Sequence, residues 1–395
     1  MTEVLPLSPT KISQNKKLCK KIQINHKRNK HQDHTMLLDE AAKSFDYAAA
    51  KDEYWNPEEF SLLYGTPLWD QSDDTQRLRL NQLYWVAYYS QIISAEIATI
   101  FFNQTSAAGL YGLEDFRDVC DMLDLESAQE RAHINAFKTI ADQVESDLFG
   151  ERVFSWSMRG PYAQTMIFPD SNKLKDWWKS LQLRSFGLLS SGSAFIASQY
   201  FTVRGLRTLN GKLVQHKLSQ YYAKHPDQEQ APIPSAISYY HFMDESFHFN
   251  SSCLIGTEVI DALPKPTAFE RFVGNLSIKG CQRDHSNYSA VVNGLFWYEP
   301  ATFNAVYKVL RSHIFNMDHQ EAIEMMKKCF GEENEGNLAA QKMHETAIES
   351  YKRYLDPLDY VNSENKDLKL MRQSTLPKYL ANNQKALANF TGPVL

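Results

Sequence analysis

Apolar residues recur at helical spacing over long stretches of this chain, and short breaks separate the stretches. Over residues 73–105, leucine, isoleucine, valine and tryptophan follow one another without a glycine or a proline. The same pattern predicts long helices over residues 113–145, 172–209 and 234–262, and further helices over 267–280, 301–330 and 338–354. Few segments alternate with the period of two that is typical of strands. The pattern therefore predicts an all-α fold, in which four long helices form a bundle with additional helices C-terminal to it.

The two ends of the chain lack this pattern. Residues 11–30 carry 8 lysine or arginine residues and no acid, with few large apolar residues among them. We therefore expect residues 1–36 to form a flexible basic arm. Residues 356–395 are rich in asparagine, lysine and proline, and we expect an extended tail there. The helical domain would span residues 37–355.

Composition indicates which kinds of binding partner the protein lacks. The formal net charge is -5, which provides no overall positive field, so we expect no nucleic-acid partner. No run approaches the roughly 20 apolar residues of a membrane span, and we expect no stable membrane insertion. The 5 cysteines stand singly, without the close spacing of zinc sites. Together with the lack of an apolar signal core in the first residues, they predict a cytoplasmic protein.

One glutamate lies in the middle of the first long apolar run. Between Arg79 and Glu114 the only charged residue is Glu96. An ionised carboxylate in such surroundings is costly unless it is paired or binds a metal ion. A protonated glutamate, or one paired with a distant arginine, explains Glu96 equally well when it is considered alone.

Two later helices each contain a Glu-x-x-His motif. The first is Glu130 with His133, and the second is Glu245 with His248, preceded by His241 one turn earlier. Residues three or four apart share a helix face, so each set can converge on one point. Carboxylate and imidazole ligands suit iron or manganese, and paired motifs of this kind build dinuclear centres in helical bundles. The alternative is that these residues lie on solvated helix faces. Asp244, directly before Glu245, either orients a ligand histidine or faces solvent.

These residues resemble the pattern of ferritin-like dinuclear iron oxygenases related to the arylamine N-oxygenases of antibiotic biosynthesis. That pattern is a glutamate, about thirty residues, then Asp-Glu-x-x-His, used twice. Glu96, Glu130 and His133 match its first half, except that Gln129 replaces the aspartate, and the family's extra histidine matches His241. The likeness covers about residues 80–260. It implies a ferritin-like bundle that activates dioxygen at two iron ions bound by Glu96, Glu130, His133, His241, Glu245 and His248, with manganese as the alternative metal.

The chain departs from that pattern on the third long helix, which should supply a fourth glutamate. Residues 177–226 contain neither aspartate nor glutamate, and the midpoint of the predicted helix carries the small residues Ser191, Gly192 and Ser193. Small residues there either permit close helix packing or form a pocket in which chloride or another halide replaces the missing carboxylate. The second option resembles cyanobacterial dimetal-carboxylate halogenases of the cylindrocyclophane type, which chlorinate unactivated carbon of fatty acyl chains. Gln199 or Glu126 as a substitute ligand remains a third option.

The resemblance favours a halogenase that acts on a fatty acyl substrate, either free or bound to an acyl carrier protein. Such an enzyme needs an external electron donor, and a homodimer is compatible with the sequence. A hydroxylating or N-oxygenating oxygenase is the second hypothesis. A non-catalytic metal-binding helical bundle is the third.

Overall fold

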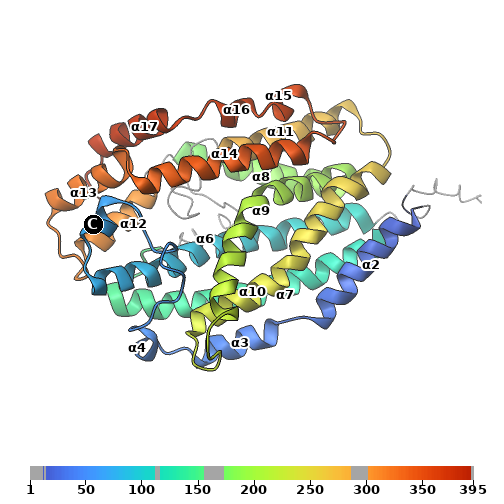
Figure 1. Ribbon diagram of the computed structural model, residues 1–395. Coiled ribbons are helices and arrows are strands. Elements are labelled where there is room, and N and C mark those ends of the chain that lie inside the picture. Colours follow the sequence, from blue (N-terminus) through green and yellow to red (C-terminus); the bar gives the residue numbers. More distant parts are fainter. Residues whose placement is uncertain (1–11, 13–14, 112–115, 155–172, 286–300, 393–395) are drawn as a thin grey trace, which may run out of the picture.

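The computed structural model describes residues 12, 15–111, 116–154, 173–285 and 301–392. Every regular element in these ranges is a helix, which confirms the all-α prediction (Figure 1). The long helices are α6 (Asp74–Tyr111), α7 (Arg117–Phe149), α8 (Lys173–Gly192), α9 (Ala194–Ala223) and α10 (Ile233–Cys253). Before them come α2 (Lys16–His31), α3 (Thr35–Ser44), α4 (Tyr47–Ala50) and α5 (Pro67–Gln71). None of the described helices is long and apolar enough to cross a membrane.

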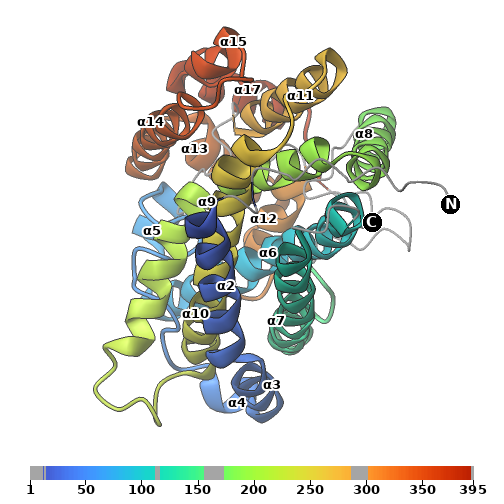
Figure 2. The same ribbon diagram turned by 90° about the vertical axis from the view of Figure 1, so that its right-hand side faces the viewer.

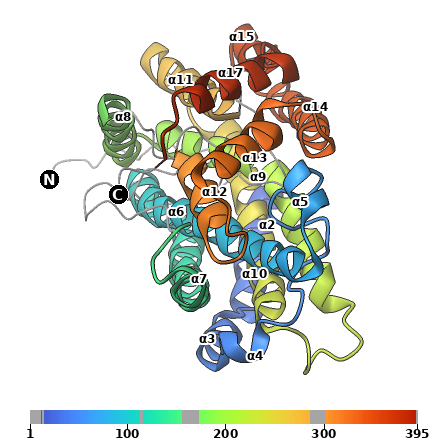
Figure 3. The ribbon, with the colours of Figure 1, turned by 90° about the vertical axis from the view of Figure 1, so that its left-hand side faces the viewer.

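The elements after α10 begin with a π-helical turn, η2 (Leu254–Val259), and a 3₁₀ turn, η3 (Ile260–Ala262). They continue with α11 (Ala268–His285), α12 (Ala301–Arg311), α13 (His319–Gly331), α14 (Glu335–Leu355), α15 (Ser363–Lys366), α16 (Lys369–Arg372) and α17 (Leu376–Ala388). In Figure 1, α14 and α17 run along the top of the molecule, above α6, α7 and α10. Figure 3 shows α12, α13 and α17 together at one end, and α13 packs against both α12 and α17.

The core of the fold is built on α6. From Leu80 to Gln91 every residue of this helix is buried, which is expected for a helix surrounded by others. Helix α6 packs against α7, α8 and α9, and α10 packs against α9 and α7. Helix α7 ends at Phe149, and Gly150 follows with a φ of 66°, the left-handed conformation that glycine adopts without steric cost. These four helices, α6, α7, α9 and α10, carry the residues of the site described below.

The third long helix predicted from the sequence is in fact two helices. Helix α8 ends at Gly192, and α9 begins after Ser193, whose hydroxyl accepts a hydrogen bond from the Ile196 backbone N–H at 3.2 Å. A serine that caps the N–H groups of a helix start is a strong local signal for a new helix. The region 301–330 is likewise divided, into α12 and α13, where Asp318 caps α13.

The prediction of a flexible basic arm is wrong for residues 16–31. Helix α2 packs against α7 and α10, and Leu18, Ile22, Asn25 and Asn29 are buried at helical spacing. The views in Figures 2 and 3 both place α2 beside α10. Only two of these four inward residues are apolar, so the sequence shows a weak hydrophobic pattern although the helix is packed.

The prediction of an extended C-terminal tail is also wrong. Residues 363–388 form α15, α16 and α17, and α17 packs against α13. The inward face of α17 carries Leu376, Tyr379, Asn383 and Leu387. The Asn383 side-chain amide donates a hydrogen bond to the Phe330 carbonyl at 3.0 Å. Asn383 can be buried because its amide is hydrogen-bonded. As in α2, a buried asparagine weakens the hydrophobic pattern of a helix that is nevertheless packed.

Candidate metal centre

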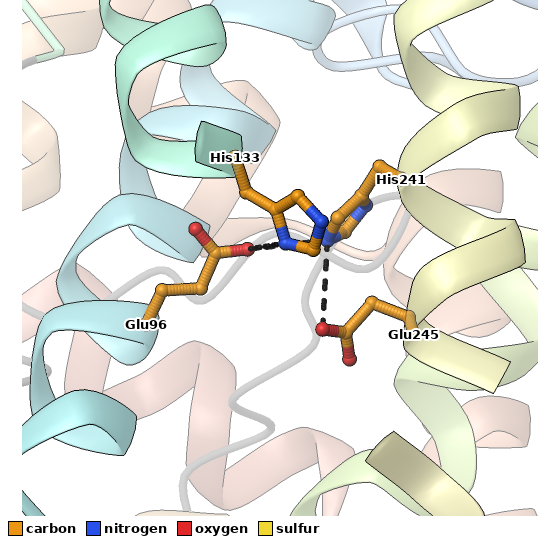
Figure 4. A group of neighbouring side chains, drawn as sticks. All are labelled: Glu96, His133, His241 and Glu245. Carbon is orange, nitrogen blue, oxygen red and sulfur yellow. Dashed lines mark hydrogen bonds and ion pairs between the residues drawn. The ribbon is translucent and has the colours of Figure 1, made fainter. Parts of the chain in front are cut away.

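Three helices bring the six predicted ligand residues together in the interior. Helix α6 contributes Glu96, α7 contributes Glu130 and His133, and α10 contributes His241, Glu245 and His248. All six side chains are buried. Figure 4 shows that Glu96, His133, His241 and Glu245 point toward one another from these helices. The alternative that the motifs lie on solvated helix faces is thereby excluded.

The six residues divide into two groups with metal-ligand spacing. One group is Glu96, His133, His241 and Glu245, and the other is Glu130, Glu245 and His248. In each group one ligand atom per residue lies within 4.8 Å of all the others. Glu245 belongs to both groups, so it would contribute a ligand to each of two cations held there. A shared carboxylate fits a dinuclear centre built from Glu-x-x-His helices.

The acidic oxygens and the imidazole nitrogens face each other directly. His241 Nε2 lies 3.1 Å from Glu96 Oε1, and His248 Nδ1 lies 2.6 Å from Glu245 Oε1 and 3.3 Å from Glu130 Oε1. His133 Nδ1 lies 3.4 Å from Glu130 Oε2. The second oxygen of Glu96 is buried without a hydrogen-bond partner. A buried donor set with an unsatisfied carboxylate oxygen fits a hard divalent cation such as iron or manganese.

Burial and mutual attraction shift the pKa values of the cluster residues in opposite directions. Burial raises the pKa of the Glu96 carboxyl. Burial also opposes ionisation of Glu130, but the charge of His248 and the hydrogen bond to His133 outweigh it and lower the pKa of that carboxyl. Burial disfavours the charged imidazole of His248, yet the neighbouring Glu245 and Glu130 raise its pKa to about 10. His248 Nδ1 faces the carboxylates that would hold a cation with it, so metal binding there would displace the proton from that nitrogen.

The outer nitrogens of two histidines are each held from the opposite helix. Asp244 is buried in α10, and its Oδ2 lies 3.3 Å from Nε2 of His133 in α7. Gln129 is buried in α7, and its Oε1 lies 2.9 Å from Nε2 of His248 in α10. Of the two possibilities for Asp244, the structure therefore selects contact with a histidine. Gln129, which replaces the aspartate of the common pattern, makes the equivalent contact.

Helix α9, from which the sequence pattern calls for a fourth carboxylate, places a cation beside the cluster instead. The guanidinium of Arg204 is buried, with Nη1 2.9 Å from Glu126 Oε2 and Nη2 3.6 Å from Glu130 Oε1. Sequence reasoning missed Arg204. The signal was Glu126, one turn before Glu130 on the same buried face, which required a positive partner.

Neither Gln199 nor Glu126 replaces the missing glutamate as the sequence options suggested. Gln199 is buried against Gly274 of α11, where a Cβ on that glycine would stand 2.7 Å from Gln199 Oε1. Glu126 is paired with Arg204. Glu126 is therefore engaged by a cation, and the Gln199 amide lies against α11, where neither of its polar atoms has a hydrogen-bond partner among the described residues.

The predicted halide pocket at Ser191, Gly192 and Ser193 is wrong in its location. Ser191 and Gly192 are exposed, and the Ser193 hydroxyl donates to Glu270 at 2.6 Å. Ser193 precedes Arg204 by eleven positions, which corresponds to about 16 Å along a helix. These small residues serve the junction of α8 and α9, so an anion beside the buried cluster would have to be held elsewhere.

Aromatic rings enclose the His241 side of the cluster. The ring of Phe137 meets the His241 imidazole edge-on at a centroid distance of 4.9 Å, and that of Tyr89 does so at 5.7 Å. Both rings are buried. They give the cluster an apolar wall, which keeps water away from the groups inside.

Comparison with known proteins agrees with this site. The family model described as acyl halogenase, CylC-like, matches residues 17–391, which include all six cluster residues, α2 except its first residue, and all of α17. No curated protein and no solved structure gives a significant match. A family model that spans nearly the whole chain, on a fold that buries a cluster with dimetal spacing, shows that the chain belongs to the CylC-like acyl halogenase family.

Proposed function

We propose that this acyl halogenase holds two iron ions on the six cluster residues and uses dioxygen to replace a C–H bond of a fatty acyl chain by a carbon–halogen bond. The observation that carries the proposal is the absence of any carboxylate from residues 177–226, which include all of α9. Helix α9 packs against both α6 and α10, so a carboxylate on it would be able to complete the ligand set.

Charge balance favours an anion beside such a metal pair. Two divalent cations carry four positive charges, and the ligand carboxylates Glu96, Glu130 and Glu245 carry three negative ones. Arg204 and Glu126 form an ion pair and cancel. One positive charge is left in a buried site, where an uncompensated charge is costly, and a halide can neutralise it.

The metal pair, when bound, supplies the activation of dioxygen that cleavage of an unactivated C–H bond requires. The protein residues bind and orient the pair: Asp244 and Gln129 hold two ligand imidazoles from outside, and Glu245 is shared between the two groups. Phe137 and Tyr89 exclude water, which would otherwise compete with the halide for the substrate. We also propose that electrons come from an external donor and that the substrate arrives free or on an acyl carrier protein.

The test is a turnover assay with protein loaded with Fe(II), a chemical reductant, dioxygen and a fatty acyl thioester. With chloride or bromide in the buffer, we expect product masses that carry the isotope pattern of the halogen supplied. Labelled dioxygen should leave no label on the acyl carbon. Product that carries labelled oxygen and no halogen would instead establish a hydroxylase. Glu96→Gln, which keeps the shape and removes the ligand charge, should abolish both products.

A further inference from the structure

Two residues in the segment before the long helices are connected to the cluster histidines by hydrogen bonds. Each connection passes through one intervening side chain. They are Asn29 in α2 and His34, which directly precedes α3. Asn29 is buried, and both side chains hydrogen-bond to residues that contact a cluster histidine. Figure 2 shows α2 and α3 lying against α10 and α7.

The first connection runs from His34 to His133. Both the backbone N–H and Nδ1 of His34 lie within hydrogen-bond distance of Asp244 Oδ1, at 3.1 and 2.9 Å. The other oxygen of Asp244 lies 3.3 Å from His133 Nε2. A carboxylate at Nε2 keeps the proton of the neutral imidazole on that nitrogen, which leaves Nδ1 free for a metal ion. His34 therefore holds the Asp244 carboxylate in place, and that carboxylate orients the imidazole of His133.

The second connection runs from Asn29 to His248. The two amides of Asn29 and Gln129 pair reciprocally, with N···O distances of 2.9 and 2.8 Å. This pairing holds the Gln129 amide in the orientation in which its oxygen faces both Asn29 Nδ2 and His248 Nε2. The Gln129 oxygen is then left to accept from His248 Nε2 at 2.9 Å. Without Asn29 the amide can rotate and present an N–H to an N–H.

We propose that Asn29 and His34 are positioning residues of the dimetal centre, each acting on a different cation. This inference rests on the proposed function in so far as the cluster must bind metal. His133 belongs to the group of four residues with Glu96, and His248 belongs to the group of three with Glu130. His34 thus supports the cation of the first group and Asn29 that of the second. The segment predicted to be a mobile arm is an outer part of the metal site.

The two cations should also bind with unequal strength. The first group has two imidazoles, one of them backed by the carboxylate of Asp244. The second group has one imidazole, backed by a neutral amide. The additional ligand and the negative charge of Asp244 strengthen the first site relative to the second. Asn29 therefore supports binding of the second, more weakly bound cation.

The experiment is an anaerobic titration of the metal-free full-length protein with Fe(II), or with Co(II) for its visible absorption. His133→Ala and His248→Ala identify which binding step belongs to which group. His248→Ala should remove one binding step. Asn29→Ala should lower the metal affinity of that same step by about 10- to 100-fold and leave the affinity of the other step unchanged. His34→Ala should weaken the step that His133→Ala removes, and His34→Asn, which restores a donor near the Nδ1 position, should recover part of the loss.

Asn25→Ala is the matched control. Asn25 is buried on the same face of α2 and donates to the Phe247 carbonyl at 3.2 Å, the Ser251 hydroxyl at 2.9 Å and the Met122 sulfur at 3.5 Å, and none of these three acceptor atoms holds the imidazole of a cluster histidine. Its replacement should lower the melting temperature without changing either metal step.

Equal weakening of both steps by Asn29→Ala, His34→Ala and Asn25→Ala would overturn the proposal, because α2 and α3 would then act only through packing. Unchanged titrations of Asn29→Ala and His34→Ala would overturn it as well. A wild-type protein that binds no metal would refute the dimetal function itself. The two failures are therefore distinguishable.

Discussion

Replacing Arg204 should destabilise the metal-free protein more than replacing any surface cation, because the guanidinium is buried between two carboxylates. Its distance of 2.9 Å to Glu126 corresponds to an attraction of about 6 kcal/mol at an effective dielectric constant of about 20. Arg204→Gln leaves Glu126 as a buried charge without a cation, and one oxygen of that carboxylate already lacks a hydrogen-bond partner. Breaking a buried pair in this way costs about 3–5 kcal/mol.

Replacing the other partner, Glu126, should lower the free energy of unfolding by less. In Glu126→Gln, Arg204 still has Glu130 at 3.6 Å, so the guanidinium keeps one carboxylate partner. The double variant Arg204→Gln with Glu126→Gln buries two amides that can hydrogen-bond, and it should be more stable than Arg204→Gln alone. We expect a coupling energy of about 2–3 kcal/mol between the two positions, within the range for residues in one ion-pair network.

The assay is urea unfolding of the four metal-free proteins at pH 7, followed by circular dichroism. Lys138 and Asp142 provide a matched control, since they form an ion pair at 3.1 Å with side chains 38% and 37% exposed. Their coupling should be about 0.3–0.5 kcal/mol. A coupling between Arg204 and Glu126 no larger than that of the exposed pair would refute the reasoning, because it would mean that water reaches the guanidinium.

Three further predictions address ligand sharing, packing and pH. Glu245→Ala should lower bound Fe(II) more than Glu96→Ala does when metal content is measured after dialysis, because only Glu245 belongs to both ligand groups. Glu96→Ala should retain about one cation, and equal stoichiometries would contradict the shared role. Gly256→Ala should lower the free energy of unfolding by about 1–3 kcal/mol, since its Cβ would lie 2.8 Å from the Thr202 backbone nitrogen, whereas Gly211→Ala, with no atom within 4 Å, should not. Burial lowers the pKa of His285 from 6.5 to about 4. Between these pH values His285 is protonated in the unfolded chain and neutral in the folded protein. Stability should fall by up to about 3 kcal/mol as the pH drops from 6.5 to 4, and His285→Gln should show a flatter pH dependence of unfolding by urea.

The ligand residues could be predicted from the sequence because their signal is local. Glu130 with His133, and Glu245 with His248, share helix faces by spacing alone, and Glu96 stands out as the single charged residue between Arg79 and Glu114. The break at Ser193 was harder to predict, since it rests on one capping serine within a helical pattern. That break moves the small residues away from the cluster and with them the predicted halide pocket.

The outer supports could not be predicted in the same way. Asn29 and Gln129 are 100 positions apart, and nothing in either local pattern indicates that their amides pair. Arg204 is one of several basic residues in a helix without acids, and only the packing of α9 selects it. Long-range pairing of polar side chains depends on the register between helices, which a periodicity of apolar residues does not encode.

The register between α7 and α10 explains why the two motifs work only together. Gln129 lies against His248, and His133 lies against Asp244, so an advance of four residues along α7 matches a retreat of four along α10. Met122, seven residues before Gln129, and Ser251, three residues after His248, are also in contact, with Sδ and Oγ 3.2 Å apart. The helices are therefore antiparallel, and each Glu-x-x-His places its histidine beside the residue that precedes the glutamate of the other. A single motif supplies a glutamate and a histidine but no partner for the outer nitrogen, whereas two motifs in antiparallel register supply that partner to each other.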